Sequence, residues 1–279
     1  MPECTGDYLI LNGKPERVSL NENFQPGSGL SVYEVFRIIN RIPLFIEDHL
    51  ERFENSAFLA GKKFPLSKQG ILSDIVQLIR LNPFEDANIK LLLQVPGENE
   101  ESEPFLAAFF IEHQYPGETD FRNGVATVTL KASRANPNAK LINQPLRERT
   151  NRMKEELGIY EVMLLDEDVC ITEASRSNVF FIRGNNFITP PASCVLPGVT
   201  RKHAIEAIHN LNYQCLEQPV RLTELPGMEA AFITGTSRKL LPVNRIDKHL
   251  FNAGNSLLRE AMNEFNRIVN TYLSEHPAS

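Results

Sequence analysis

Apolar residues follow two different spacings along the first part of the chain. Short runs rich in Val, Ile and Leu that stop at Gly, Asn or Pro are typical of strands. Apolar residues three and four positions apart are typical of helices. Helices are therefore predicted over residues 46–57 and 71–81. Strands are predicted over residues 8–12, 32–40, 44–46, 88–95 and 105–111, with a turn at residues 41–43.

The helix predicted from residue 46 carries a polar flank beside its apolar stripe. The stripe runs from Ile46 to Ala57 at spacings of four, three and four residues. Residues three and four positions apart share one side of a helix. His49, Arg52 and Ser56 are therefore expected to lie together on one flank of the stripe.

The later part of the chain alternates strands with helices. Gly158 ends a helical stripe and is a predicted C-terminal cap, and residues 184–186 predict a tight hairpin. Strands are predicted over residues 125–131, 160–165, 179–183 and 230–234, and helices over residues 146–157, 200–211 and 256–273. Pro and Gly among polar residues at 112–124 indicate a linker. The predicted organisation is an N-terminal α+β domain at residues 1–115, a linker at 116–124 and a C-terminal α/β domain at 125–279.

Composition and charge disfavour several classes of function. The chain has 279 residues, a formal net charge of −6 and no Trp, which disfavours nucleic-acid binding. No apolar run is long enough for a membrane span, and no signal peptide is visible, so a cytoplasmic location is expected. The four cysteines form no C-x-x-C pair, and the six histidines form no H-E-x-x-H motif. Free thiols and no metal site are expected.

Two residues could carry chemistry, although each also has an ordinary interpretation. Lys140 lies between a turn and a helix start, where most lysines are simply exposed. A partly buried lysine, however, can form a Schiff base with an aldehyde. Glu173, in a segment rich in hydroxyl side chains, is either a loop carboxylate or a partner for a pyridinium nitrogen.

Two further motifs could bind an anion. Residues 196–201 read Leu-Pro-Gly-Val-Thr-Arg before a predicted helix, where Thr200 is either a helix cap or part of a phosphate seat. Residues 234–237 read Thr-Gly-Thr-Ser after a strand, and they form either a plain turn or a second set of phosphate donors. None of these features is specific by itself.

Their order along the chain resembles the class IV, or fold-type IV, pyridoxal-phosphate aminotransferases. This family includes branched-chain aminotransferases, D-amino-acid aminotransferases and aminodeoxychorismate lyases. The resemblance extends from about Leu9 to Val243. It rests on the motifs at residues 32–35, 49–53, 140, 160–161, 172–173, 177–180, 196–201, 235–236 and 242–243. It implies an α+β fold of two domains, similar to D-amino-acid aminotransferase, with the cofactor between the domains.

The resemblance also implies a role for each matched residue. Lys140 would hold pyridoxal 5'-phosphate and move the Cα proton of the substrate, and Glu173 would keep the ring nitrogen protonated. Arg52 would fork onto the phosphate. The remaining cofactor-binding residues implied are Ser177, Asn178, Leu196, Val199, Thr200 and Thr236.

Departures from the family pattern concern the substrate. D-amino-acid aminotransferases carry an Arg-x-His carboxylate trap where residues 96–103 read Pro-Gly-Glu-Asn-Glu-Glu-Ser-Glu. If this acidic loop reaches the substrate pocket, poor activity on D-alanine and D-glutamate is expected; if it points into solvent, it is an ordinary hairpin turn. Residues 143–145 read Asn-Gln-Pro, without the tyrosine that branched-chain enzymes place after the lysine. Alternative carboxylate binders are Arg37, Arg134 and Arg238, each of which could equally be a surface residue, and Tyr33 is expected in the substrate pocket.

The expected activity is transfer of an amino group from an amino acid to a 2-oxo acid. A lyase that forms 4-aminobenzoate from aminodeoxychorismate would use the same residues, and it remains an alternative. A non-catalytic protein that binds the cofactor is a second alternative. The resemblance further implies a homodimer, and the composition predicts no membrane or nucleic-acid partner.

Overall fold

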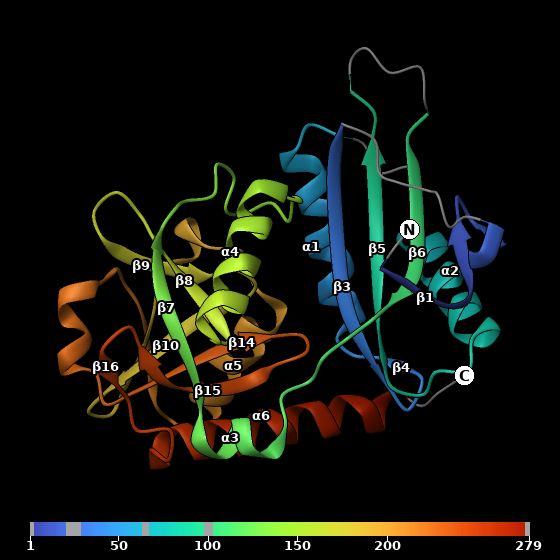
Figure 1. Ribbon diagram of the computed structural model, residues 1–279. Coiled ribbons are helices and arrows are strands. Elements are labelled where there is room, and N and C mark those ends of the chain that lie inside the picture. The colour runs from blue at the N-terminus through green and yellow to red at the C-terminus, as the bar shows by residue number, and fades with distance from the viewer. Residues whose placement is uncertain (1–2, 21–28, 63–66, 98–102, 277–279) are drawn as a thin grey trace. The chain divides into compact units, whose positions relative to one another are not determined.

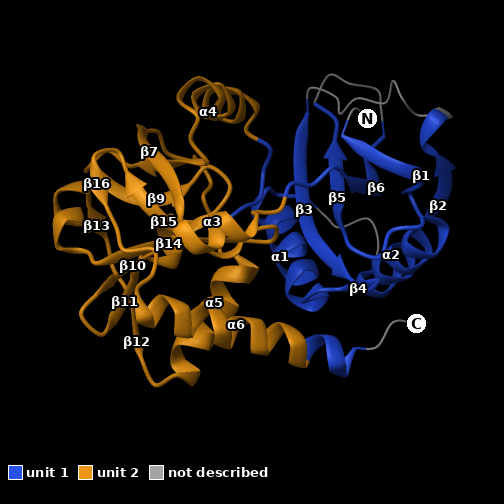
Figure 2. Ribbon diagram, turned by 60° about the horizontal axis from the view of Figure 1, so that its bottom comes forward, with its two compact units in different colours: residues 1–114, 139–142, 272–279 blue, residues 115–138, 143–271 orange. Residues whose placement is uncertain are grey.

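The computed structural model divides the chain into two compact units (Figure 2). It describes all residues except 1–2, 21–28, 63–66, 98–102 and 277–279. Unit 1 comprises residues 1–114, 139–142 and 272–279, and unit 2 comprises residues 115–138 and 143–271. Residues 139–142, which carry Lys140, therefore belong to the unit built from the N-terminal part of the chain, unlike in the predicted division.

Unit 1 is an antiparallel sheet of six strands with two helices (Figure 1). The strand order is β2-β1-β6-β5-β3-β4. The strands are β1 Cys4–Leu11, β2 Lys14–Arg17, β3 Leu30–Ile39, β4 Ile42–Pro43, β5 Ala87–Val95 and β6 Phe105–Ile111, and the helices are α1 Ile46–Leu59 and α2 Lys68–Leu81. Alternate residues of β3, among them Val32, Phe36 and Ile38, share one buried core with both helices.

The hairpin at β3 and β4 corrects one prediction. Asn40 and Arg41 have φ angles of 50° and 65°, in the left-handed region that a two-residue hairpin turn of type I′ requires at both positions. The return strand therefore begins at Ile42, which pairs with Ile39, rather than at Leu44. Because the turn is this short, residues 44–46 do not form the predicted strand, and α1 begins at Ile46.

Residues 139–142 pair with the edge of β3. Leu141 forms an isolated antiparallel bridge with Val32. The Tyr33 N–H donates to the Lys140 carbonyl at 3.1 Å, and the Ile142 N–H donates to the Ser31 carbonyl at 3.0 Å. These bonds satisfy edge groups of β3 that would otherwise lack partners, and they fix the Lys140 segment in unit 1.

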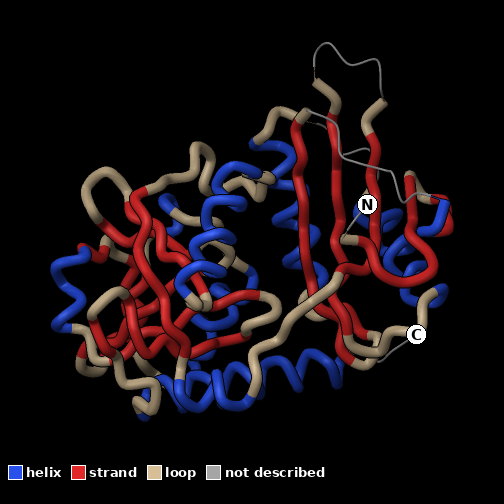
Figure 3. Tube along the Cα trace, in the orientation of Figure 1, coloured by secondary structure: helices blue, strands red, loops and turns tan. Residues whose placement is uncertain are grey.

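Unit 2 is built on a mixed sheet of ten strands (Figure 3). The order is β12-β11-β10-β14-β15-β7-β8-β9-β13, and β16 pairs with β15. The strands are β7 Val125–Lys131, β8 Glu161–Leu165, β9 Cys170–Ala174, β10 Asn178–Arg183, β11 Asn186–Thr189, β12 Gln214–Glu217, β13 Val220–Arg221, β14 Ala230–Gly235, β15 Lys239–Ile246 and β16 His249–Leu250. The helices are α3 Glu118–Asn123, α4 Gln144–Leu157, α5 Val199–Asn210 and α6 Ser256–Glu275, whose residues from Tyr272 onward belong to unit 1.

Three predictions in unit 2 need correction. The predicted linker contains α3, because the Asp120 carboxylate accepts from the Gly117 N–H and Gly124 ends the helix at a φ of 73°. Glu173 lies on strand β9 rather than in a loop. Gly198, not Thr200, is the N-terminal cap residue of α5. The predicted cap at Gly158 is confirmed, since it ends α4 at a φ of 60°.

Candidate active site

A buried carboxylate organises the cationic side chains of unit 1. Glu34 points from β3 into the face covered by α1, and its side chain is fully buried. Arg52 donates to it through Nε at 2.9 Å and Nη2 at 2.6 Å, which is a bidentate pair. Nδ1 of His49, one turn earlier on α1, lies 3.1 Å from Oε1. The predicted flank of His49, Arg52 and Ser56 is therefore present, and Glu34 is its partner.

These neighbours shift the pKa values of both buried groups. Burial alone raises the pKa of the Glu34 carboxyl, but Arg52 and then His49 outweigh it, and the pKa lies well below its ordinary value. Burial lowers the pKa of His49 and outweighs the opposing effect of Glu34. At neutral pH, the unit thus holds a charged Glu34–Arg52 pair beside a neutral imidazole.

Lys140 lies against Tyr33 in the same unit. Nζ of Lys140 is 5.0 Å from the centroid of the Tyr33 ring, and Nζ of the buried Lys90 is 5.6 Å from it. Lys90 also forms an ion pair with Glu3 at 2.5 Å. Arg37 is half-buried four residues after Tyr33, so the two side chains lie on the same face of β3.

Unit 2 holds Glu173 between an arginine and a main-chain amide. Nε of Arg134 is 2.7 Å from Oε1 of Glu173, and Oε2 accepts from the Leu196 N–H at 3.1 Å. The Leu196 carbonyl accepts from the Asn178 side chain at 2.8 Å. Three of the predicted cofactor residues, Glu173, Asn178 and Leu196, are thus joined in one network.

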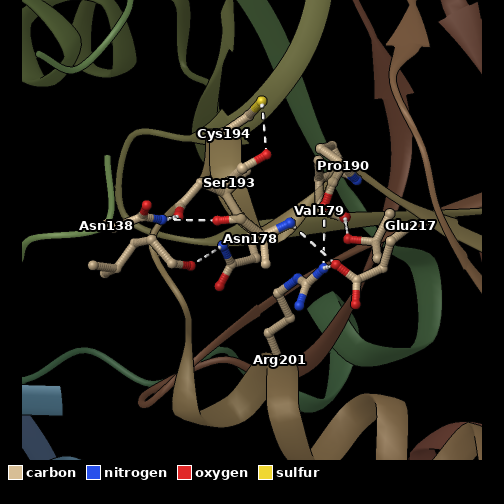
Figure 4. Close-up of polar contacts among 12 residues, drawn as sticks. Asn138, Asn178, Val179, Pro190, Ser193, Cys194, Arg201 and Glu217 are labelled. Atoms are coloured by element: carbon tan, nitrogen blue, oxygen red, sulfur yellow. Dashed lines mark hydrogen bonds and ion pairs between the residues drawn. The ribbon is translucent and has the colours of Figure 1, made fainter. Parts of the chain in front are cut away.

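The start of α5 lies next to this network. Val199 and Thr200 are its first two residues, and no side chain caps them. A Cβ at Gly198 would lie 2.1 Å from Oδ1 of Asn178, so only glycine allows this close approach. The last residue of the motif, Arg201, turns away to Glu217 and the Pro190 carbonyl (Figure 4). Arg201 therefore anchors the start of the helix.

A third buried carboxylate, that of Glu161, supports the loops at Ser177 and Arg238. Glu161 accepts from Ser175 Oγ at 2.5 Å and Ser177 Oγ at 3.5 Å, and Nη2 of Arg238 is 3.2 Å away. Burial opposes its ionisation, but Arg238 and other donors lower the pKa of Glu161 below its ordinary value. Arg238 also lies over the Tyr160 ring, so it is not a plain surface residue.

The contacts of several residues in these networks were not predicted from the sequence. Glu34 could have been found, because it interrupts the inward apolar positions Val32, Phe36 and Ile38 of its strand. The sequence predicts a substrate-binding or surface role for Arg134 and not its pairing with Glu173. Thr236 is half-buried in the turn after β14. Most of the acidic loop, residues 98–102, lies outside the described residues, while Glu103 is exposed.

Comparisons with known proteins identify the family of the chain. Residues 31–246 match the family model for amino-transferase class IV. The D-alanine aminotransferase of Bacillus licheniformis is 28% identical over 244 residues, covering 84% of each chain. A protein of Rickettsia bellii named "Probable branched-chain-amino-acid aminotransferase" is 28% identical over 225 residues and 78% of each chain. The chain belongs to the class IV aminotransferase family, as the sequence predicted.

A solved structure shows the same fold. The branched-chain amino acid aminotransferase of Thermobaculum terrenum, solved in its PLP-bound holo form, superposes with a TM-score of 0.83 at 21% identity, covering 97% of this chain and 96% of the other. The predicted α+β fold is therefore confirmed. None of the described helices combines the length and the apolar character that a membrane span requires.

Proposed function

We propose that the chain is a pyridoxal-phosphate aminotransferase that moves an amino group from an amino acid to a 2-oxo acid. The observation that carries the proposal is the family match over residues 31–246, which contains every residue assigned a role. In unit 1, Lys140 binds the aldehyde of the cofactor. Arg52, steadied by Glu34, donates to its phosphate. The pairing with Glu34 restricts the guanidinium to one orientation, which favours directed hydrogen bonds over a diffuse positive field.

The residues of unit 2 also suit this cofactor. The uncapped start of α5 supplies free N–H groups and a positive dipole end for a phosphate, near Val199 and Thr200. Thr236 and Ser177 add hydroxyl groups from turns, and Asn178 adds a side-chain amide at the start of β10. Glu173 is an acceptor for the ring nitrogen, held in place by Arg134. Leu196 supplies an apolar side chain for the ring.

The reaction requires a group that carries the Cα proton of the substrate, and we assign this role to Nζ of Lys140. When bound, the cofactor supplies an aldehyde that exchanges amino groups and a ring that accepts the electron pair of a broken Cα–H bond. Nζ of Lys140 would take the Cα proton of the substrate and give it to the former aldehyde carbon of the cofactor, so that the amino group stays behind when the 2-oxo acid leaves. The Glu173 carboxylate keeps the ring nitrogen protonated. Tyr33, beside Lys140, limits the directions from which Nζ can approach the substrate.

Arg37 and Arg238 are the proposed binders of the substrate carboxylate. Removing Arg238 takes away the main cationic partner of the buried Glu161, so Arg238→Gln should be compared at a temperature where its fold is shown to be intact. We expect a raised KM for the preferred donor with unchanged cofactor binding for whichever arginine has this role. Unchanged kinetics in both Arg238→Gln and the matching Arg37→Gln variant would remove both assignments.

The amino donor is best sought with a half-reaction. Purified protein loaded with pyridoxal phosphate is mixed with single amino acids, and pyridoxamine phosphate is followed by absorbance. A transaminase accumulates it, whereas a lyase releases pyruvate from aminodeoxychorismate without doing so. Poor reaction with D-alanine and D-glutamate is expected from the acidic loop. The homodimer and the cytoplasmic location also stay predictions, and sedimentation would test the first.

A further inference from the structure

The hydroxyl of Ser56 makes two main-chain contacts that the cofactor roles leave unexplained. Ser56 lies on α1 and is fully buried. Its Oγ donates to the Arg52 carbonyl at 2.8 Å and accepts from the Lys140 N–H at 3.1 Å. One hydroxyl thus joins the helix that carries Arg52 to the main chain of Lys140, 84 residues later in the sequence.

This contact completes the fixation of Lys140. The Tyr33 N–H already holds the carbonyl of Lys140, and the Ile142 N–H is bound to Ser31. Ser56 holds the remaining polar group, the N–H of Lys140 itself. With both main-chain groups bound, the direction in which the lysine side chain leaves the backbone is set.

We propose that Ser56 is a positioning residue for Lys140. The inference rests on the proposed function, in which Nζ of Lys140 binds an aldehyde. Without the hydroxyl, the Lys140 N–H loses its acceptor, and the lysine spends less time in the geometry needed for attack. The guanidinium of Arg52 is held separately, by the Glu34 carboxylate. Loss of Ser56 should therefore weaken aldehyde capture while it leaves phosphate recognition intact.

Pyridoxal, which lacks the phosphate, separates these two effects. Apoprotein is titrated with pyridoxal and with pyridoxal phosphate, and the adduct on Lys140 is fixed with borohydride and quantified by mass spectrometry. Ser56→Ala should weaken capture of both compounds about fivefold, the effect of one lost hydrogen bond. The ratio of the two dissociation constants should stay at the wild-type value. Glu34→Gln should instead change that ratio, because it releases Arg52.

Two further variants separate this role from a general loss of stability. Thr150→Ala removes another buried hydroxyl that donates to a carbonyl one turn earlier, that of Leu146, and it should capture pyridoxal like the wild type. Ser56→Cys keeps the size but only weak hydrogen bonding, and it should fall between Ser56→Ala and the wild type. If Ser56→Ala does not fold, the cysteine variant decides by the same criterion.

The possible failures are distinguishable. Wild-type capture of pyridoxal by a folded Ser56→Ala protein would overturn the role of Ser56 and leave the proposed function standing. A changed ratio of dissociation constants in Ser56→Ala would also overturn it, since the effect would then pass through phosphate recognition. Absence of any adduct on Lys140 in the wild type would overturn the proposed function and this inference together.

Discussion

Unit 1 and unit 2 each bury a carboxylate against an arginine, but the proposed function uses opposite members of the two pairs. In unit 1, Arg52 is the proposed cofactor contact and the enclosed Glu34 supports it. In unit 2, Glu173 is the contact and Arg134 supports it. A buried ion pair contributes little net stability when compared with a well-packed apolar pair. We therefore infer that each pair serves to orient one charged group, Arg52 in unit 1 and Glu173 in unit 2.

The largest expected loss of turnover comes from replacing Lys140, because no other residue is proposed for its role in either unit. Lys140→Ala should lower turnover by about 10³-fold or more, because the variant loses its proton carrier. Weak cofactor binding should persist through the phosphate contacts. Single-turnover kinetics with the best donor would measure this. A variant that retained turnover would remove Lys140 from the mechanism.

The two members of the unit 2 pair should differ in effect. Glu173→Gln removes the proposed charge opposite the ring nitrogen and should lower turnover about 100- to 1,000-fold. Arg134→Met leaves the carboxylate in place but loosens it, so a smaller loss is expected. Steady-state kinetics on both variants test this order. Equal losses would show that Arg134 matters as much as its partner, and a larger loss for Arg134→Met would reverse the assignment.

A substitution in the unit 1 pair should change the affinity for pyridoxal phosphate more than it changes turnover. Arg52→Ala removes charge-assisted hydrogen bonds to the phosphate and should raise the dissociation constant of pyridoxal phosphate about ten- to a hundredfold. Turnover of the saturated variant should change less. Titration of apoprotein measures the first quantity. An unchanged dissociation constant would leave Arg52 with a purely structural role toward Glu34.

The smallest expected effect is a loss of folding stability in acid, caused by the neutral imidazole of His49 in unit 1. The folded-state pKa of His49 is lowered from 6.5, so the unfolded chain takes up this proton first as the pH falls. Stability is therefore lost below about pH 6.5, by at most about 1.4 kcal/mol per pH unit for one group. Denaturant unfolding of wild type and His49→Gln at several pH values measures the difference. Identical slopes would mean that His49 titrates alike in both states.

The elements that sequence patterns predicted are those with local causes. The apolar stripe from Ile46 predicted α1, and the glycine at position 158 predicted the end of α4. The return strand at Ile42 was missed because Asn40 favours a positive φ angle but Arg41, the second turn residue, does not. The helix α3 was missed because it is short and polar.

The site residues also divide into those that sequence motifs assigned and those that depend on contacts between distant segments. Lys140, Arg52 and Glu173 were assigned by resemblance, and their roles remain proposals. The partners of these residues could not be predicted, because each comes from a distant segment. Ser56 meets Lys140 across 84 residues, and Arg134 meets Glu173 from the loop after another strand. Such contacts depend on which strand edge a segment joins, and local periodicity does not specify that.

The attachment point of the cofactor tests the central claim most directly. Protein loaded with pyridoxal phosphate is reduced with borohydride, digested and mapped by mass spectrometry. We expect a yellow protein before reduction and one modified peptide, with the reduced cofactor on Lys140. Modification of Lys131 or Lys154 in its place, or a protein that takes up no cofactor, would contradict it.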